Sequence, residues 1–145
     1  MLSRSLNASI LRAHNINQTM RHFIAYHNAI KIGYSCVTLL SPRVITKKSV
    51  VNLEGVTVWL ISGEGKSPKS YFLAAKFAAN NCEQNKFPGS KLPNQISGPG
   101  HLFKLARPIN GTSLLRLILE RSNNFRNGFH EVADAKIINE LMGLI

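Results

Sequence analysis

Apolar runs in the first half of the chain predict β-strands. Residues 22–27 (HFIAYH) are rich in aromatic and β-branched side chains, which favour a strand. Residues 56–61 (VTVWLI) present apolar side chains on both alternating faces, as expected of a central strand covered on each side. The glycines and the proline of residues 62–70 indicate a reversal of direction, so residues 71–79 are predicted to form the antiparallel partner. Helix propensity alone would also allow a helix over residues 71–82, but the aromatic start and the hairpin-like connection favour a strand.

Segments with few apolar residues are predicted to be loops. A loop is expected over residues 28–34, which contain Gly33. Residues 41–53 combine a proline with basic residues and an N-cap candidate at Ser49, which predicts a loop and one short helical turn. Residues 85–101 hold three prolines and three glycines and are predicted to form one long, basic loop. Loops of this length without structure of their own are often functional.

The second half of the chain predicts two helices. Residues 102–105 are expected to return to the sheet as a strand, and residues 128–132 form another short strand. Helix caps are expected at Thr112 or Ser113 and at Asp134. The apolar stripes of the two helices contain Leu114, Leu117 and Ile118, and then Ile137, Ile138, Leu141 and Met142. Because strands come first and helices mainly late, the predicted fold is α+β, with a small, mostly antiparallel sheet or a pseudo-barrel flanked by helices.

The length of 145 residues fits one domain, which we place at residues 20–145. Residues 1–19 are basic, lack acidic residues and are expected to be an unpacked leader. A cytoplasmic location is expected because the two cysteines, Cys36 and Cys82, are interpreted as ordinary reduced side chains; an organellar location is the alternative if residues 1–19 are a transit peptide. Cys36 and Cys82 have neither zinc-site spacing nor the density of a disulfide scaffold. No apolar run approaches the roughly 18 residues of a membrane span, so no membrane partner is expected.

Charge is the most informative total. The chain has 18 Lys and Arg against 7 Asp and Glu, a formal net charge of +11, and no acidic residue precedes Glu54. Repulsion among so many positive charges destabilises the compact state, and such an excess is commonly tolerated when an anionic partner neutralises it. Residues 134–145 are close to charge-balanced, so the basic surface is expected to come from the first two thirds of the chain.

The catalytic motifs that we tested are absent or incomplete. Gly65-Lys66-Ser67 resembles the end of a phosphate-binding P-loop, but the required earlier glycine is replaced by Leu60. There is no HExxH pair, no serine in a nucleophile elbow, and the seven acidic residues make a carboxylate metal centre hard to assemble. The sequence therefore predicts no catalytic residue, no metal ligand and no cofactor.

Aromatic and basic residues remain as the binding candidates. The aromatic side chains are Tyr26, Tyr34, Trp59 and Tyr71, and the nearby cations are Lys31, Arg43, Lys47, Lys48, Lys66 and Lys69. Nucleobases stack on such rings, and phosphates pair with such cations. The alternative for Trp59 and Tyr71 is a place in the hydrophobic core.

Four short motifs carry a resemblance to a known group. They are RHFIAYHN at residues 21–28, GYS at residues 33–35, VWLISGEG at residues 58–65, and Asn124-Phe125 followed by Gly128-Phe129. Over residues 20–142 the chain resembles small, largely uncharacterised bacterial proteins that occur alone or beside nuclease modules, distantly similar to EVE/PUA-like domains. The longer loop at residues 85–101 and the basic leader depart from that group.

The resemblance implies a PUA-like pseudo-barrel that binds RNA or holds a flipped, often modified base in an aromatic pocket. Among the recurring motifs, the candidates for that role are Tyr26, His27, Tyr34 and Trp59. We therefore predict a nucleic-acid-binding module that contacts DNA or RNA, with a nuclease as an implied protein partner. The alternatives are a structural component of a ribonucleoprotein and a nuclease that uses His22, His27 or His101 with a metal.

Overall fold

The computed structural model describes residues 21–29, 43–46, 48, 50–66, 68–84, 94–126 and 128–145, without the side chains of residues 45, 84 and 101–105. The predicted leader at residues 1–19 lies outside the described residues. So do Tyr34 and Lys47, most of the loop predicted at residues 28–34, and the N-cap candidate Ser49.

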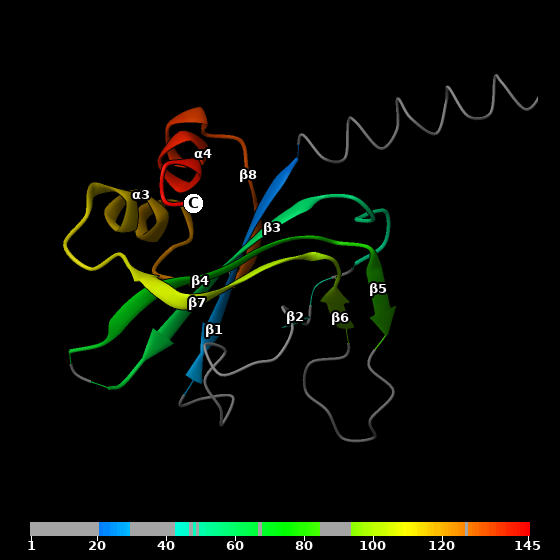
Figure 1. Ribbon diagram of the computed structural model, residues 1–145, viewed down its shortest axis with the longest axis horizontal. Coiled ribbons are helices and arrows are strands. Elements are labelled where there is room, and N and C mark those ends of the chain that lie inside the picture. Colours follow the sequence, from blue (N-terminus) through cyan, green and yellow to red (C-terminus); the bar gives the residue numbers. More distant parts are fainter. Residues whose placement is uncertain are drawn as a thin grey trace, which may run out of the picture.

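A five-stranded sheet forms the centre of the molecule (Figure 1). Its strands are β1 (His22–Asn28), β3 (Thr57–Glu64), β4 (Ser70–Ala78), β7 (Gly100–Pro108) and β8 (Phe129–Val132). The strand order is β7-β4-β3-β1-β8, with β1 and β3 parallel and the other neighbours antiparallel. The apolar run at residues 56–61 thus becomes the central strand, as predicted, and residues 71–78 pair with it as a strand. The helical alternative for residues 71–82 is wrong.

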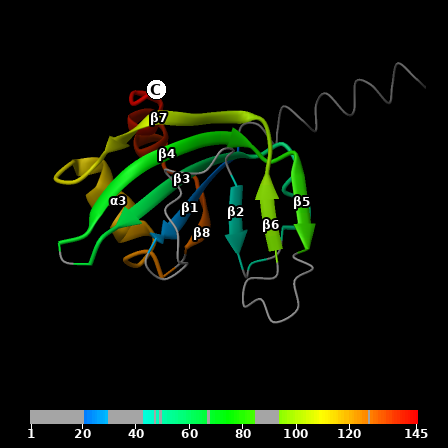
Figure 2. The ribbon, with the colours of Figure 1, turned by 60° about the horizontal axis from the view of Figure 1, so that its bottom comes forward.

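A second, three-stranded sheet arises because one long hairpin bends. Its strands are β2 (Arg43–Thr46), β6 (Asn94–Ser97) and β5 (Asn81–Gln84), in the order β2-β6-β5. Only Ala79 and Asn80 separate β4 from β5, and only Gly98 and Pro99 separate β6 from β7. The paired strands therefore leave the large sheet together and fold over its face (Figure 2).

Glycine permits this bend because the two chains come very close. A Cβ on Gly98 would overlap the carbonyl oxygen of Ala78, and one on Gly100 would overlap the backbone of Phe77. Strand glycines often mark such close approaches of two backbones. The single loop predicted over residues 85–101 is therefore wrong at residues 94–97 and 100–101, which lie in strands. Residues 43–46, predicted as part of a loop with a helical turn, also form a strand.

Two helices, α3 (Ser113–Arg121) and α4 (Ala135–Met142), cover the other face of the large sheet (Figure 1). The hydroxyl of Thr112 accepts the N–H of Leu115 at 3.1 Å, which caps α3. The carboxylate of Asp134 accepts the N–H of Lys136 at 2.9 Å, which caps α4. Both predicted helices and their caps are confirmed. No helix in the described part of the chain is long and apolar enough to cross a bilayer.

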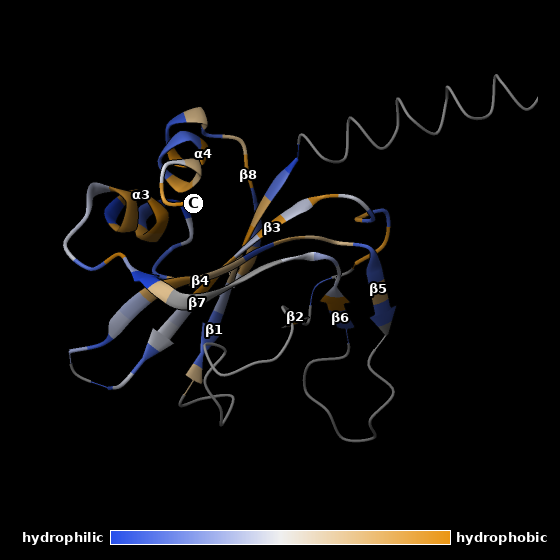
Figure 3. Ribbon diagram, viewed as in Figure 1, coloured by the Kyte–Doolittle hydropathy of each residue, from blue (hydrophilic) through white to orange (hydrophobic). Residues whose placement is uncertain are grey.

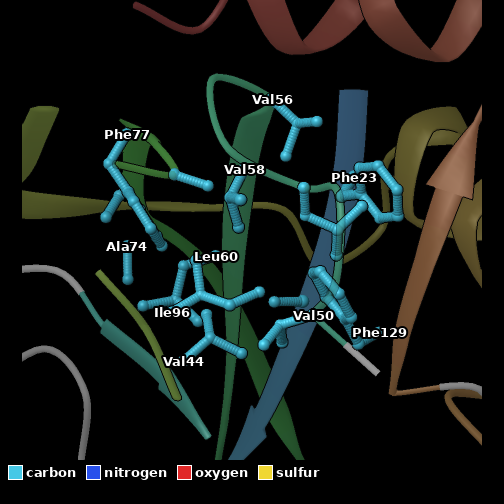
Figure 4. Close-up of a cluster of buried hydrophobic side chains, with 14 residues drawn as sticks. Phe23, Val44, Val50, Val56, Val58, Leu60, Ala74, Phe77, Ile96 and Phe129 are labelled. Carbon is cyan, nitrogen blue, oxygen red and sulfur yellow. The ribbon is translucent and has the colours of Figure 1, made fainter. Parts of the chain in front are cut away.

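Hydrophobic side chains fill both spaces between the layers because alternate strand residues point to opposite faces. The first cluster, which includes Leu60, Phe77 and Ile96, lies between the two sheets (Figure 4). The second lies under the helices and includes Trp59, Ile118 and Leu141. The hydropathy colours show apolar residues along the central strands and on one side of each helix (Figure 3). The fold is mixed α+β, and it is not a closed barrel.

Candidate nucleic-acid interface

Two tyrosines meet over a glycine on the helix-covered face of the large sheet. Tyr71 on β4 is the register partner of Gly63 on β3. From the other side, the ring of Tyr26 on β1 reaches over the same glycine, so that a Cβ on Gly63 would overlap the Tyr26 hydroxyl. The two ring centroids are 6.2 Å apart. Because Gly63 has no side chain, the rings of Tyr26 and Tyr71 from two non-adjacent strands can meet above it.

Phe125 completes this group, which we call the tyrosine cluster (Tyr26, Tyr71 and Phe125). Its ring stacks on Tyr26 with a centroid distance of 4.1 Å and an angle of 10° between the ring planes. It also lies 5.6 Å from the ring of Tyr71. Phe125 itself is buried, whereas both tyrosines are only partly buried. The two tyrosines therefore present the accessible part of the cluster.

The chain reaches Phe125 through an unusual backbone conformation. Asn123, Asn124 and Phe125 have φ angles of 52°, 56° and 62°. Asparagine tolerates this left-handed region, but a bulky residue such as phenylalanine enters it only at a cost. Two hydrogen bonds hold the turn: Asn124 N–H donates to the Leu119 carbonyl at 2.8 Å, and Phe125 N–H donates to the Ser122 hydroxyl at 3.0 Å.

Burial makes the Tyr26 phenol a weaker acid than an exposed tyrosine. It raises the pKa of Tyr26 to about 12, with smaller contributions from Tyr71 and Glu64. The phenol is therefore neutral at physiological pH and keeps its proton as a hydrogen-bond donor. Glu64 is engaged nearby, because its Oε1 accepts a hydrogen bond of 2.6 Å from the hydroxyl of the buried Ser62.

Three cations accompany the tyrosine cluster at this end of the sheet. Lys66 and Lys69 lie in the turn between β3 and β4, and Arg126 directly follows Phe125. Asn110 ties the turn to the cluster: its amide donates to the Lys69 carbonyl at 3.1 Å and its oxygen accepts the Tyr71 N–H at 2.6 Å. Within the described residues, no ion pair involves these three cations.

The structure brings together three of the predicted site residues, namely Tyr26, Lys66 and Lys69. Lys48 is exposed but belongs to the region of the three-stranded sheet, where its carbonyl accepts a hydrogen bond from the Asn94 amide at 2.7 Å. His27 is only 7% exposed. Tyr34 and Lys47 lie outside the described residues.

Trp59 occupies the core, which was the alternative for this residue. It has no exposed surface. Its indole N–H donates to Nδ1 of His22 at 3.0 Å, and the ammonium of Lys76 lies 5.1 Å from the ring centroid. A nucleobase has no access to this ring in the folded molecule. The role predicted for Trp59 in base stacking is therefore replaced by a role in packing.

Sequence reasoning did not select Phe125, Asn110 or Arg126 as site residues. Phe125 is part of a motif that carries the resemblance, and the preceding Asn123-Asn124 pair is compatible with a left-handed turn, so a signal for this segment existed. Asn110 has no such signal, because its role depends on the distant residues Lys69 and Tyr71.

The described residues hold no group of three or more His, Cys, Asp or Glu side chains that could bind a metal. A scan against protein-family models finds no family that matches the chain, and a search of curated proteins finds no matching relative.

Proposed function

We propose that this protein is a nucleic-acid-binding module that stacks bases on the tyrosine cluster and contacts phosphates with Lys66, Lys69 and Arg126. The observation that carries the proposal is the coincidence of two partly exposed tyrosine rings with three cations at one end of a strongly basic chain. Ring stacking contributes about 1–3 kcal/mol per base, and each cation adds attraction to the backbone.

The distribution of charge supports this end of the molecule over the helical surface. On the helices, Arg121 pairs with Asp134 at 3.3 Å, and residues 113–121 and 134–142 together contain three basic and three acidic residues. Glu64 is the acidic residue nearest in sequence to Lys66 and Lys69, and its carboxylate accepts a hydrogen bond from Ser62. Glu131, five residues after Arg126, pairs with Arg21 at 2.9 Å. A polyanion would therefore meet less repulsion at the tyrosine cluster than on the helices.

In its finer form, the proposal is that the module reads a single flipped or modified base. The side chains of Tyr26 and Tyr71 suit this role, because each combines an apolar face for stacking with a hydroxyl that can bond a base edge. DNA and RNA both carry bases and phosphates, so the experiment compares binding of the two nucleic acids.

A binding screen tests the proposal. Single- and double-stranded DNA and RNA, with and without modified bases, are titrated with the protein at several salt concentrations. We expect affinity to fall linearly on a log–log plot against salt, and the Lys66→Met and Lys69→Met variants each to lower that slope by about one unit. Tyr71→Ala should weaken binding by about 1–3 kcal/mol, whereas Tyr71→Phe retains the stacking.

Lys136→Met serves as the matched control, because Lys136 is an exposed cation on α4 and belongs neither to the tyrosine cluster nor to the turn between β3 and β4. It should leave both affinity and salt slope nearly unchanged. Binding that is insensitive to salt, or a Lys136→Met variant as defective as the Lys66 and Lys69 variants, would contradict the proposal. A preference for one modified base would support its finer form.

A further inference from the structure

Phe125 covers one face of the Tyr26 ring in the way that a nucleobase would. The two ring planes are nearly parallel, at 10°, and their centroids are 4.1 Å apart. The ring of Tyr71 is tilted instead, by 40° against Tyr26 and by 32° against Phe125. Bases bind aromatic side chains by stacking face to face with them. A base that stacks on this face of Tyr26 must therefore take the place of Phe125.

The backbone that carries the Phe125 ring is strained. Phe125 is the last of three consecutive residues in the left-handed region, with a φ angle of 62°. Asparagine visits this region readily, which suits Asn123 and Asn124, but for the bulky Phe125 it is an outlier. Strain of this kind clusters at ligand clamps and switch regions, where it is part of the mechanism. Here the strain opposes part of the free energy that burial of the Phe125 ring provides.

The strained turn is anchored at the end of α3. Ser122 has no exposed surface and follows the last residue of the helix, and its hydroxyl accepts the Phe125 N–H at 3.0 Å. Beyond this anchor, Asn123, Asn124 and Arg126 are exposed, whereas Phe125 is buried. The Phe125 ring is thus the part of the turn beyond Ser122 that leaves the core if the turn opens.

The same turn carries a cation for the phosphate of a nucleotide. Arg126 directly follows Phe125 and is exposed. Arginine attracts the nucleic-acid backbone through its charge, whatever the sequence of bases. A nucleotide that approaches the covered face of Tyr26 therefore meets a positive charge on the segment that has to move.

We propose that Phe125 is an internal substitute for a base: it stacks on Tyr26 in the free protein, and an incoming unpaired base displaces it. This inference rests on the proposed function, because it concerns the regulation of the same tyrosine cluster. When only a fraction of the molecules is open, the apparent affinity is reduced by that fraction. Removal of the Phe125 ring should therefore tighten binding. A residue that merely supports Tyr26 would have the opposite effect, since its removal would weaken binding.

Fluorescence anisotropy with labelled single-stranded DNA and RNA dodecamers of mixed sequence tests this sign. Phe125→Leu keeps an apolar side chain at the border of the core but has no flat ring to stack on Tyr26. We expect it to bind at least about threefold more tightly than the natural sequence. Phe129→Leu is the matched control, because the Phe129 ring stacks on Phe23 at 5.0 Å in the first core cluster. It should leave the affinity nearly unchanged.

Nuclear Overhauser effects follow the displacement in the natural sequence. Contacts between the ring protons of Phe125 and Tyr26 should be present in the free protein and lost when the oligonucleotide saturates it. Contacts between Tyr26 and base protons should appear in the same titration. This measurement needs no variant, so it tests the inference even if Phe125→Leu perturbs the fold.

The inference is overturned if the contacts between Phe125 and Tyr26 persist in the saturated complex. It is equally overturned if the natural sequence binds and a folded Phe125→Leu variant binds no more tightly. The same holds if Phe129→Leu tightens binding as much, because general loosening of the fold would then be the cause. These three results leave the proposed function standing. If neither the natural sequence nor Phe125→Leu binds either oligonucleotide, the proposed function itself fails and this inference fails with it.

Discussion

The two ends of one sheet face combine the same chemistry in opposite ways. At one end, Trp59 lies beside a histidine and a lysine and has no exposed surface. At the other end, Tyr26 and Tyr71 lie near lysines and remain partly exposed. Both ends place an aromatic ring beside a cation on the central strands. The difference teaches that this pairing alone does not identify a binding surface.

Whether the aromatic ring is buried depends on the residue that β3 contributes at each end and on what packs over it. At Trp59, the central strand itself supplies the ring, and the helical layer packs over it as part of the second core cluster. At Gly63, the central strand supplies no side chain, so two tyrosines from β1 and β4 lean together across the gap. Phe125 lies against that pair, with ring centroids 4.1 Å from Tyr26 and 5.6 Å from Tyr71.

The largest effect expected from this contrast is on stability. Trp59→Ala should lower the free energy of unfolding by about 3–5 kcal/mol, because it leaves a large cavity in the core. Tyr71→Ala removes a partly exposed ring and should cost closer to about 1 kcal/mol. Urea denaturation followed by circular dichroism measures both. Equal losses for the two variants would mean that the rings do not differ in burial.

A smaller effect is expected from Gly63→Ala. The new methyl group would overlap the Tyr26 hydroxyl, so the Tyr26 ring must move away from Tyr71. We expect a loss of about 1–3 kcal/mol in stability, together with weaker oligonucleotide binding. Gly128→Ala is the matched control, since its Cβ would meet only the Phe125 carbonyl oxygen at 4.0 Å. An intact tyrosine pair in Gly63→Ala would contradict the proposed cause of the cluster.

The smallest effect concerns pH at the buried end. Burial and Lys76 lower the pKa of His22, so the unfolded chain, with a histidine pKa of about 6.5, binds the proton first as pH falls. This contribution to stability is therefore complete above that pKa and is lost as pH falls through the window below it. His22→Gln can still accept the Trp59 N–H but does not titrate. Its unfolding free energy, measured over the same pH series, should fall less steeply; identical slopes would contradict the assignment.

The elements that could be predicted from the sequence are those with a local signal. The central strand at residues 56–61 has a continuous apolar run, and both helices have a capping residue at Thr112 and Asp134. The strands β5 and β6, with the sequences NCEQ and NQIS, have no such pattern. They exist because the hairpin that begins with β4 and β7 continues past the bend, which depends on the close approach at Gly98 and Gly100.

In the candidate site, too, the residues that could be predicted are those with a local signal in the sequence. Tyr26 is an aromatic residue within β1, and Lys66 and Lys69 are basic residues close to the ends of β3 and β4, so residue type and position in the sequence were enough to select them. The burial of Trp59 depends on packing under helices far along the chain, and Met142, predicted to face inward, is 43% exposed beside Lys76. The contact between Tyr26 and Phe125 joins β1 to the segment after α3. No local pattern contains these long-range contacts.

Nuclear magnetic resonance of the protein with a single-stranded oligonucleotide tests the central claim most directly. The ring protons of Tyr26 and Tyr71 and the indole N–H of Trp59 are followed in the same titration. Stacking of bases on the tyrosine cluster predicts large shifts for the tyrosine rings and none for the indole N–H, which stays bonded to His22. A shifted Trp59 signal with unchanged tyrosine signals would contradict this account of the molecule.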